Sequence, residues 1–559
     1  MIIAMEVRIS QYFSTLMMIA LLFTSANVFG QDQPYIEESA WSPSPQAGAT
    51  DVNPVTPFRV HFSTPIDPAS LTAETYLLIG PEGHPVEATV NTDLTGGVAT
   101  LTPRRPLEPN TEYRLNVTSG LMSEDGVPFQ TYETVYRTGD QRVEELEGFR
   151  FHGQKIAEHE SNSSLGVGPD GHLYVSDTKG TITRYDLDDR GLPTGEVNKV
   201  LTLNPAQIVG FIFDPNSTAE NIKIWVSYAY YYMGNYTGTI SRLHLPPKNI
   251  EGDFWEEKFI IGLPHDELLH HQPNGLAFGP DNKLYQAVGG LATLGGSPNW
   301  RVEETPMSAS VIVADVLNPD FNDGELPVNV RTAWPMSYDP FREDAPVRIY
   351  ATGLRNAYDL VWHTNGHLYS AINQNSIPQD VYTPETDEVP AITAMPHEQL
   401  ARVEEGKYYG HPNPTRGEYV LNGGNPTDGT DPWEVPEYPV GVQPEPHFDP
   451  SLIHDIRPSG GNSANGMAEF VADGSLQGRL LITYFSGGKT VYTFALDENG
   501  DVVDERPILD EEGNPYLFIS PIDVAVHPKT GLIYVADFGH WVRPAIGEDG
   551  SIWVLEPAG

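Results

Sequence analysis

The segment IDVAVHPKTGLIYVAD, residues 522–537, consists of an apolar strand, a turn and a second strand centred on an aromatic residue. The same unit occurs six times in the second part of the chain. The copies are LGVGPDGHLYVSD (165–177), VGFIFDPNSTAENIKIWVS (209–227), NGLAFGPDNKLYQAVG (274–289), YDLVWHTNGHLYSAIN (358–373), NGMAEFVADGSLQGRLLITY (465–484) and IDVAVHPKTGLIYVAD (522–537). A repeat of this kind determines the fold.

Each repeat predicts one blade of a six-bladed β-propeller. Most copies are followed by a further strand, such as GTITRYDLD (180–188), and EQLARVEEG (398–406) takes that place after the fourth copy. A small sheet that is apolar on both faces can bury them only against neighbouring sheets, and ring closure leaves no blade exposed. The predicted blade centres are Tyr174, Trp225, Tyr285, Tyr369, Leu481 and Tyr534. Longer intervals in the third and fourth blades predict insertions on the functional face.

The part that precedes the repeats predicts a separate β-sandwich. FRVHFSTPID (58–67) and EYRLNVTSG (112–120) alternate apolar and polar residues, which is the period of a half-buried strand. The stretch SPSPQAGATDVNPVTPFRVHFSTPIDPASL resembles bacterial Ig-like domains of the type found in S-layer proteins. We therefore expect an all-β chain with an Ig-like domain at 31–140, a linker at 141–149 and the propeller at 150–559.

The first 30 residues are typical of a secretory signal peptide. YFSTLMMIALLFT, at 12–24, is apolar and uncharged but shorter than a membrane span, and Val28 and Gly30 suit a cleavage site before Gln31. An uncleaved membrane anchor is the alternative. No later segment is apolar enough to span a bilayer, so we expect an exported protein, periplasmic or extracellular.

Composition excludes several classes of function. The 559 residues include 32 Lys and Arg against 76 Asp and Glu, a formal net charge of −44, and no Cys. This acidity argues against nucleic acid and anionic lipid as partners, and the lack of Cys excludes disulfides and thiolate chemistry. The sequence contains no P-loop, HExxH or GxSxG motif.

Polar residues stand where two neighbouring blades begin. His270 and His271 precede the strand of the third repeat, and Arg355 and Asn356 occupy the equivalent position in the fourth. Equivalent positions of adjacent blades converge around the central channel, so a base and a fixed cation would face one another there. Strand capping by Arg355 and Asn356, with packed histidines, is the structural alternative.

Six segments spread in order over the second part of the chain form a recognisable set. They are HQPNGLAFGPDNKLY, YATGLRNAYDLVWHTNGHLY, EEGKYYGHPN, NSANGMAEF, YFSGGKTVY and SPIDVAVHPKTGLIYVADFG. With them the second part resembles the glucose/sorbosone dehydrogenases, soluble quinoproteins with pyrroloquinoline quinone (PQQ) and calcium on a six-bladed propeller. The resemblance implies an oxidoreductase that acts on an aldose or related polyol and passes electrons to an unidentified acceptor.

Roles for individual residues follow from the resemblance alone. It implies that His271 is the general base for the sugar hydroxyl and that Arg355 acts on the quinone in catalysis. It implies cofactor contacts for Arg355, Asn356, Gln207 and Lys489. It also implies calcium ligation by the backbone carbonyls of Gln374 and Asn375.

The chain also departs from the family pattern. Gly290 stands where the family has an acidic residue, and Ser520 and Ile522 stand where active sugar dehydrogenases have two Arg residues. These departures keep two alternatives open. One is a propeller that binds a glycan or a protein without catalysis. The other is a metal-dependent lactonase with Asp177 and Asp537 as ligands, although turn capping explains those two residues as well.

Overall fold

The computed structural model describes most of both parts of the chain. The described residues are 33–38, 42–52, 54, 56–92, 97–140, 148–203, 206–230, 234–245, 254–266, 269–291, 304–373, 398–411, 413–416, 418, 449–456, 463–486, 489–540 and 547–558. Their regular structure is β-sheet with four short 3₁₀ turns. The expected signal peptide and linker residues 141–147 lie outside the described residues.

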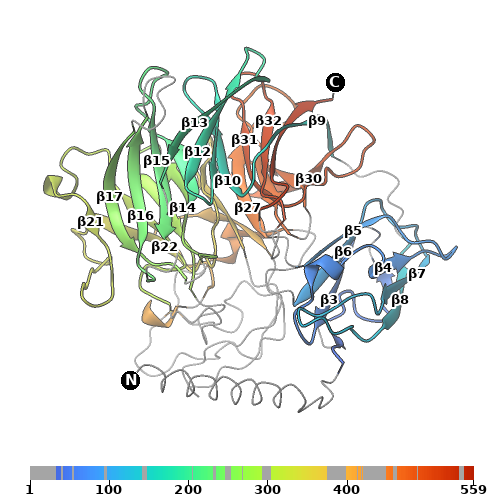
Figure 1. Cartoon of the computed structure of the whole chain (residues 1–559). Coiled ribbons are helices and arrows are strands. Elements are labelled where there is room, and N and C mark those ends of the chain that lie inside the picture. The colour runs from blue at the N-terminus through green and yellow to red at the C-terminus, as the bar shows by residue number, and fades with distance from the viewer. Residues whose placement is uncertain are drawn as a thin grey trace, which may run out of the picture.

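The N-terminal part is a sandwich of two four-stranded sheets (Figure 1). In sheet order, the first contains β1 (Ile36–Glu37), β3 (Phe58–Phe62), β6 (Val98–Pro103) and β5 (Ala88–Thr92). The second contains β2 (Thr50–Val52), β8 (Tyr132–Thr138), β7 (Glu112–Val117) and β4 (Tyr76–Ile79). Buried side chains of both sheets, including Phe58, Leu78, Leu115 and Tyr136, form one core. This arrangement confirms the predicted sandwich.

The second part is a ring of six four-stranded blades. Blade 1 contains β10 (Asn162–Val167), β11 (Leu173–Asp177), β12 (Thr181–Leu187) and β13 (Pro193–Thr202). Blade 2 contains β14 (Ala206–Phe213), β15 (Lys223–Tyr230), β16 (Gly238–His244) and β17 (Trp255–Leu263), with β21 (Val328–Asn329) added in parallel. Blade 3 contains β18 (Pro273–Phe278), β19 (Leu284–Val288), β20 (Ser310–Ala314) and β22 (Val347–Thr352).

The last three blades complete the ring. Blade 4 contains β23 (Val361–Trp362), β24 (Leu368–Ile372), β25 (Gln399–Val403) and β26 (Ile453–Asp455). Blade 5 contains β27 (Ala464–Glu469), β28 (Leu480–Tyr484), β29 (Val491–Leu496) and β30 (Val502–Leu509). Blade 6 contains β31 (Pro521–Val526), β32 (Ile533–Asp537), β33 (Ser551–Pro557) and β9 (Phe149–Glu158). The inner strands β10 and β31 contact each other, so the first and last blades meet.

The predicted blade centres all lie on second strands, and all six are buried. The strand expected within 398–406 is β25. The closing strand β9 was not predicted from the sequence. It comes from the start of the propeller and pairs antiparallel with β33 at its end, with Ser551 opposite Glu158 and Pro557 opposite Phe151. This pairing joins both ends of the propeller. It also gives the edge of β33 a partner, which an open ring would leave exposed.

We propose that the propeller folds without the sandwich, because each part has its own buried core. A fragment from Gly148 to Gly559 keeps β9 and should be soluble. In calorimetry its propeller should unfold at the same temperature as in the full chain. A matched fragment that starts at Glu160 lacks β9 and should unfold at a lower temperature. Insolubility of the longer fragment, with the full chain soluble, would contradict this boundary.

Two buried aspartates connect the blades around the central channel. The carboxylate of Asp523 accepts hydrogen bonds from the backbone N–H of Val524 and from that of Leu165 in the adjacent blade 1. Asp359 accepts in the same way from Leu360 and from Met467 of blade 5. Both line a cavity of about 250 Å³ between the inner strands. Burial raises the pKa of Asp523 to about 7, and burial together with the charge of Asp523 raises the pKa of Asp359 well above its ordinary value.

These raised pKa values make the channel sensitive to pH. A carboxyl group with a higher pKa in the folded state binds more protons there, so its contribution to stability falls as pH rises. For Asp523 the loss begins near the ordinary pKa of 3.8, reaches about 1.4 kcal/mol per pH unit, and ends near pH 7. As pH rises from about 4 to 7, the wild type should therefore lose stability relative to Asp523→Asn, which has no carboxyl group at this position. Denaturant unfolding of both proteins at several pH values measures this. A difference that does not change with pH would contradict the raised pKa.

Candidate active site

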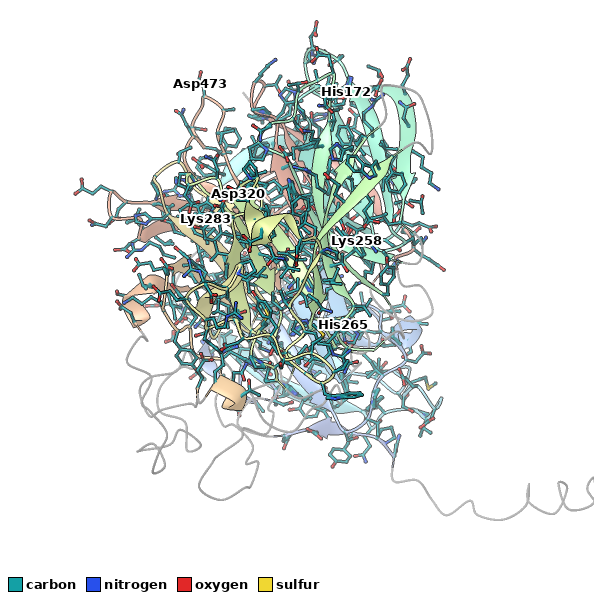
Figure 2. The ribbon with its side chains drawn as sticks, turned by 90° about the vertical axis from the view of Figure 1, so that its left-hand side faces the viewer. His172, Lys258, His265, Lys283, Asp320 and Asp473 are labelled. Atoms are coloured by element: carbon teal, nitrogen blue, oxygen red, sulfur yellow. The ribbon has the colours of Figure 1, made fainter. Side chains whose placement is uncertain are left out.

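The predicted site residues gather at one end of the ring. In each blade the inner strand begins, and the second strand ends, at this end. Figure 2 shows His265, which precedes β18, toward one end of the molecule, and His172 and Asp473, from inner turns, toward the other. His271, Arg355 and Gln207 are at the first end, at the starts of blades 3, 4 and 2.

A buried aspartate holds the loop that carries His271. The carboxylate of Asp266 accepts a hydrogen bond of 2.5 Å from the backbone N–H of His271, and the N–H of Asp266 donates to the His271 carbonyl. Leu269 between them has a φ of 57°, in the left-handed region. These bonds help to place the imidazole beside Gly290 of the same blade. No sequence pattern predicted this role for Asp266.

His271 is neutral and its tautomer is determined by its surroundings. Burial, then the charge of Arg355, lowers the pKa of His271 well below 6.5. Nδ1 lies 2.7 Å from the carbonyl oxygen of Gly290, which can only accept a hydrogen bond. Nδ1 therefore carries the proton, and Nε2 carries the lone pair that a general base requires.

Arg355 is a buried cation between two acids. Burial lowers the pKa of Arg355 to about 10, against the opposing effects of Glu398 and Glu304, so the guanidinium stays charged at neutral pH. One of its nitrogens donates a hydrogen bond of 3.0 Å to the carbonyl of Asn373. The structure brings His271 and Arg355 close enough for the charge of Arg355 to lower the pKa of His271.

The other predicted cofactor residues differ in position. Gln207 joins the His271 loop, because its amide nitrogen donates to the Leu269 carbonyl at 3.2 Å. Asn356 lies beside Arg355, but its side-chain oxygen accepts from Asn274, a bond that connects blades 3 and 4. Lys489 stands at the boundary of blades 5 and 6, where burial lowers its pKa to about 8 and the charge of Asp537 opposes this.

The expected metal ligands divide into two groups. Gln374 and Asn375, the expected calcium ligands, lie outside the described residues. Asp177 and Asp537, the lactonase candidates, are turn caps. Asp177 accepts from the N–H groups of Lys179 and Thr181, and Asp537 accepts from the backbone N–H groups of Ile519, Ser520 and Gly539. Among the residues that the structure describes, no group of three or more His, Asp or Glu side chains could hold a metal ion.

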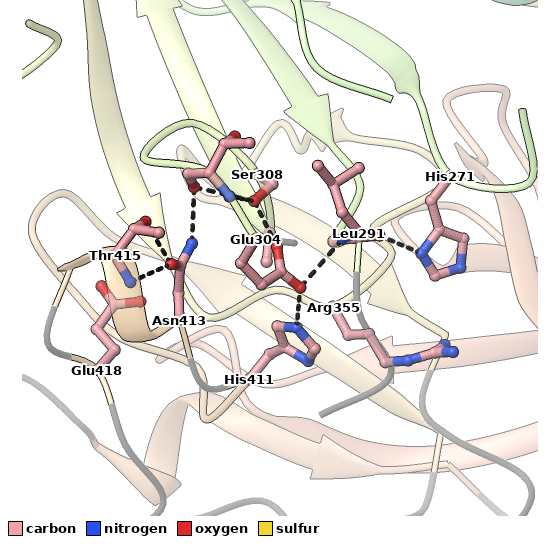
Figure 3. Close-up of polar contacts among 12 residues, drawn as sticks. His271, Leu291, Glu304, Ser308, Arg355, His411, Asn413, Thr415 and Glu418 are labelled. Carbon is pink, nitrogen blue, oxygen red and sulfur yellow. Dashed lines mark hydrogen bonds and ion pairs between the residues drawn. The ribbon is translucent and has the colours of Figure 1, made fainter. Parts of the chain in front are cut away.

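Sequence reasoning missed a buried pair, Glu304 and His411, beside His271 and Arg355 (Figure 3). His411 Nε2 lies 2.8 Å from Glu304 Oε1, and the two side chains are 0% and 1% exposed. Glu304 also accepts from the N–H of Leu291 and from the hydroxyl of Ser308. His411 lies within the quoted segment EEGKYYGHPN, but nothing local linked it to a glutamate 107 residues away.

Gly290 lies close to all four of these residues. Its carbonyl accepts from His271, and its N–H donates to the carbonyl of Arg355 at 2.5 Å. A Cβ at this position would lie 3.0 Å from His411 Nε2 and 3.2 Å from Glu304 Oε1. Position 290 therefore lacks the acidic side chain of the family pattern, but the carboxylate of Glu304 lies next to this position in space.

Two family models match the chain. Residues 33–138 match the bacterial Ig-like domain, and residues 159–537, more than half of the chain, match glucose/sorbosone dehydrogenase. The chain belongs to the glucose/sorbosone dehydrogenase family. It is accordingly a sugar dehydrogenase-like oxidoreductase with an N-terminal Ig-like domain.

The chain is also similar to several solved structures. The PQQ-bound aldose sugar dehydrogenase of Streptomyces coelicolor is 18% identical, with a TM-score of 0.46 over 73% of this chain and 98% of that chain. A putative glucose dehydrogenase of Thermus thermophilus is 19% identical, with a TM-score of 0.44 over 72% and 99%. The PQQ domain of a Coprinopsis cinerea pyranose dehydrogenase is 14% identical, with a TM-score of 0.44 over 74% and 98%. The comparison with curated proteins gives no match.

This glucose/sorbosone dehydrogenase-family chain has buried acceptor atoms near the His271 loop. Gln207 Oε1, Gln272 Oε1 and His411 Nδ1 are buried and have no hydrogen-bond partner among the described residues. Both Gln amide nitrogens donate to the Leu269 carbonyl, so the oxygens are the atoms left over. Unpaired buried acceptors carry a desolvation cost that a ligand rich in hydroxyl donors would remove.

Proposed function

We propose that the protein is an exported quinoprotein that oxidises an aldose or related polyol at this end of the propeller. The observation that supports this most is the neutral His271, with its lone pair on Nε2, beside the buried cation Arg355. An alcohol is oxidised when its O–H proton passes to a base and a hydride leaves the carbon; the O–H and C–H bonds break as the C=O bond forms. A bound quinone would supply the hydride acceptor.

The described residues suit an anionic quinone such as PQQ. A tricarboxylate needs cationic partners, and this end of the ring has the buried Arg355 and the half-buried Lys489. Arg355 and Asn356 would hold the group near His271. Gln207 would contact it beside the His271 loop, and Lys489 would contact it from the boundary of blades 5 and 6. The Arg355 guanidinium would place a fixed positive charge where negative charge develops. His271 would take the hydroxyl proton at Nε2.

Calcium and export belong to the same proposal. Calcium at the carbonyls of Gln374 and Asn375 would polarise the quinone as a Lewis acid. Residues 1–30 would direct the chain to the periplasm or the cell exterior, which suits a bacterial Ig-like domain. Among the described residues no helix is long and apolar enough to cross a membrane.

The absorption spectrum of the purified full chain tests this function. After PQQ and calcium are added and excess cofactor is removed, we expect a bound quinone band that glucose bleaches and a dye acceptor restores. Excess chelator should abolish the bleaching, and calcium should restore it better than magnesium. A chain that binds glucose but retains no quinone would instead be a glycan-binding propeller, the alternative that the unpartnered acceptor atoms favour.

A further inference from the structure

The Glu304–His411 pair is the part of the site to which the proposed chemistry gives no role. Its two members come from different blades and meet beside Gly290, next to His271 and Arg355. The charge of Glu304 acts on Arg355, and His411 Nε2 lies beside Gly290, whose carbonyl accepts from His271, so the pair belongs to the same site. It is also more deeply buried than either predicted catalytic residue.

Its hydrogen bonds determine which atom of His411 is available. Glu304 receives hydrogen bonds from the Leu291 N–H and the Ser308 hydroxyl, as an ionised carboxylate does. A carboxylate can only accept, so His411 Nε2 must donate to it. In a neutral imidazole the other nitrogen, Nδ1, is then an acceptor. Nδ1 is buried and has no partner in the described part of the chain.

We propose that His411 is a specificity-determining residue whose Nδ1 accepts a hydrogen bond from one hydroxyl of the substrate, with Glu304 holding its tautomer. The inference rests on the proposed function, because the ligand is the polyol that His271 would deprotonate at another hydroxyl. The two histidines present opposite tautomers to the site, Nδ1–H at His271 and Nε2–H at His411. Gly290 leaves the room that this arrangement requires.

Binding of glucose and its monodeoxy analogues to the cofactor-free full chain tests the inference. An acceptor left unpaired in a buried site weakens binding by about 5- to 150-fold. The wild-type protein should therefore bind one of the deoxy analogues more weakly than glucose by that factor. In His411→Gln the Gln amide can still donate to Glu304 but Nδ1 is gone, so glucose should bind as weakly as that analogue, with no further loss for the analogue itself.

Further variants keep the test independent of folding and of turnover. Gly290→Ala places a methyl group against the pair and should likewise lower the affinity for glucose to that of the one analogue, with no further loss for the analogue itself. His363→Gln is the matched control. His363 is also buried beside an acid, Glu469, but it belongs to the opposite end of the ring, so glucose affinity should not change. Nitrogen NMR of labelled histidine should show Nδ1 of His411 unprotonated and shifted by glucose.

Several outcomes would overturn the inference. They are equal losses for every analogue, an unchanged affinity in both His411→Gln and Gly290→Ala, a protonated Nδ1 in the neutral ring, or no binding of glucose or any analogue. The proposed function fails separately. Glucose that binds and shifts the His411 signal, but never reduces the quinone, would contradict the dehydrogenase alone. If the wild type oxidises glucose and His411→Gln binds glucose as tightly as the wild type does, this inference alone would be contradicted.

Discussion

Replacing His271 with Asn is expected to lower kcat for sugar oxidation by about 10²–10⁴, the usual contribution of a positioned general base. The Asn side-chain amide can still donate to the Gly290 carbonyl, while the base at Nε2 is removed. Cofactor binding and thermal stability should therefore change little. Steady-state kinetics with PQQ, calcium and a dye acceptor measures kcat, and the quinone band measures cofactor binding.

His270→Gln is the matched control for this experiment. His270 adjoins His271 in sequence, and the structure gives only His271 the bond to Gly290. Its replacement should cost far less in kcat. Because the pKa of His271 is lowered well below 6.5, its own protonation should reduce the wild-type rate only below pH 6.5. Equal small effects of both substitutions would assign the histidines a structural role and favour the binding propeller.

Replacing Gly466 with Ala is expected to destabilise the propeller by about 3 kcal/mol or more, a large overpacking effect. A Cβ on Gly466 would lie 2.2 Å from Asp523 Oδ1, 2.4 Å from Asp523 Cα and 2.7 Å from the Ile522 carbonyl oxygen. Two of these are backbone atoms of the next blade, so a side-chain rotation cannot relieve the contact. The midpoint of denaturant unfolding should fall correspondingly.

Gly166→Ala is the matched control, since Gly166 occupies the inner strand of blade 1. Its nearest neighbours for a Cβ are ring atoms of Phe213 and Phe211 at 3.5–3.7 Å, which is ordinary contact. Alanine there should leave stability unchanged or raise it slightly by restricting the unfolded chain. Similar losses in both variants would show that glycine is needed for another reason than the close approach of blades 5 and 6.

The sequence indicated more of the fold than of the site. All six second strands and the sandwich were recognisable, because alternation of apolar residues follows directly from burial of sheet faces. His271, Arg355 and Gln207 were found through family motifs, and the structure places them together. Lys489, predicted from the same motifs, lies at the same end of the ring at the boundary of blades 5 and 6, near Asp537.

The sequence by itself determined the paired strands of each repeat, how many blades they form and which family the chain resembles. Only the tertiary structure decided that β9 closes blade 6, that Asp359 and Asp523 face one cavity, and that Glu304 supports His411 beside Gly290. The physical reason is the range of the interactions. Strand periodicity is written in neighbouring residues, whereas these contacts join residues far apart in sequence and arise only when the ring closes and brings the blade ends together.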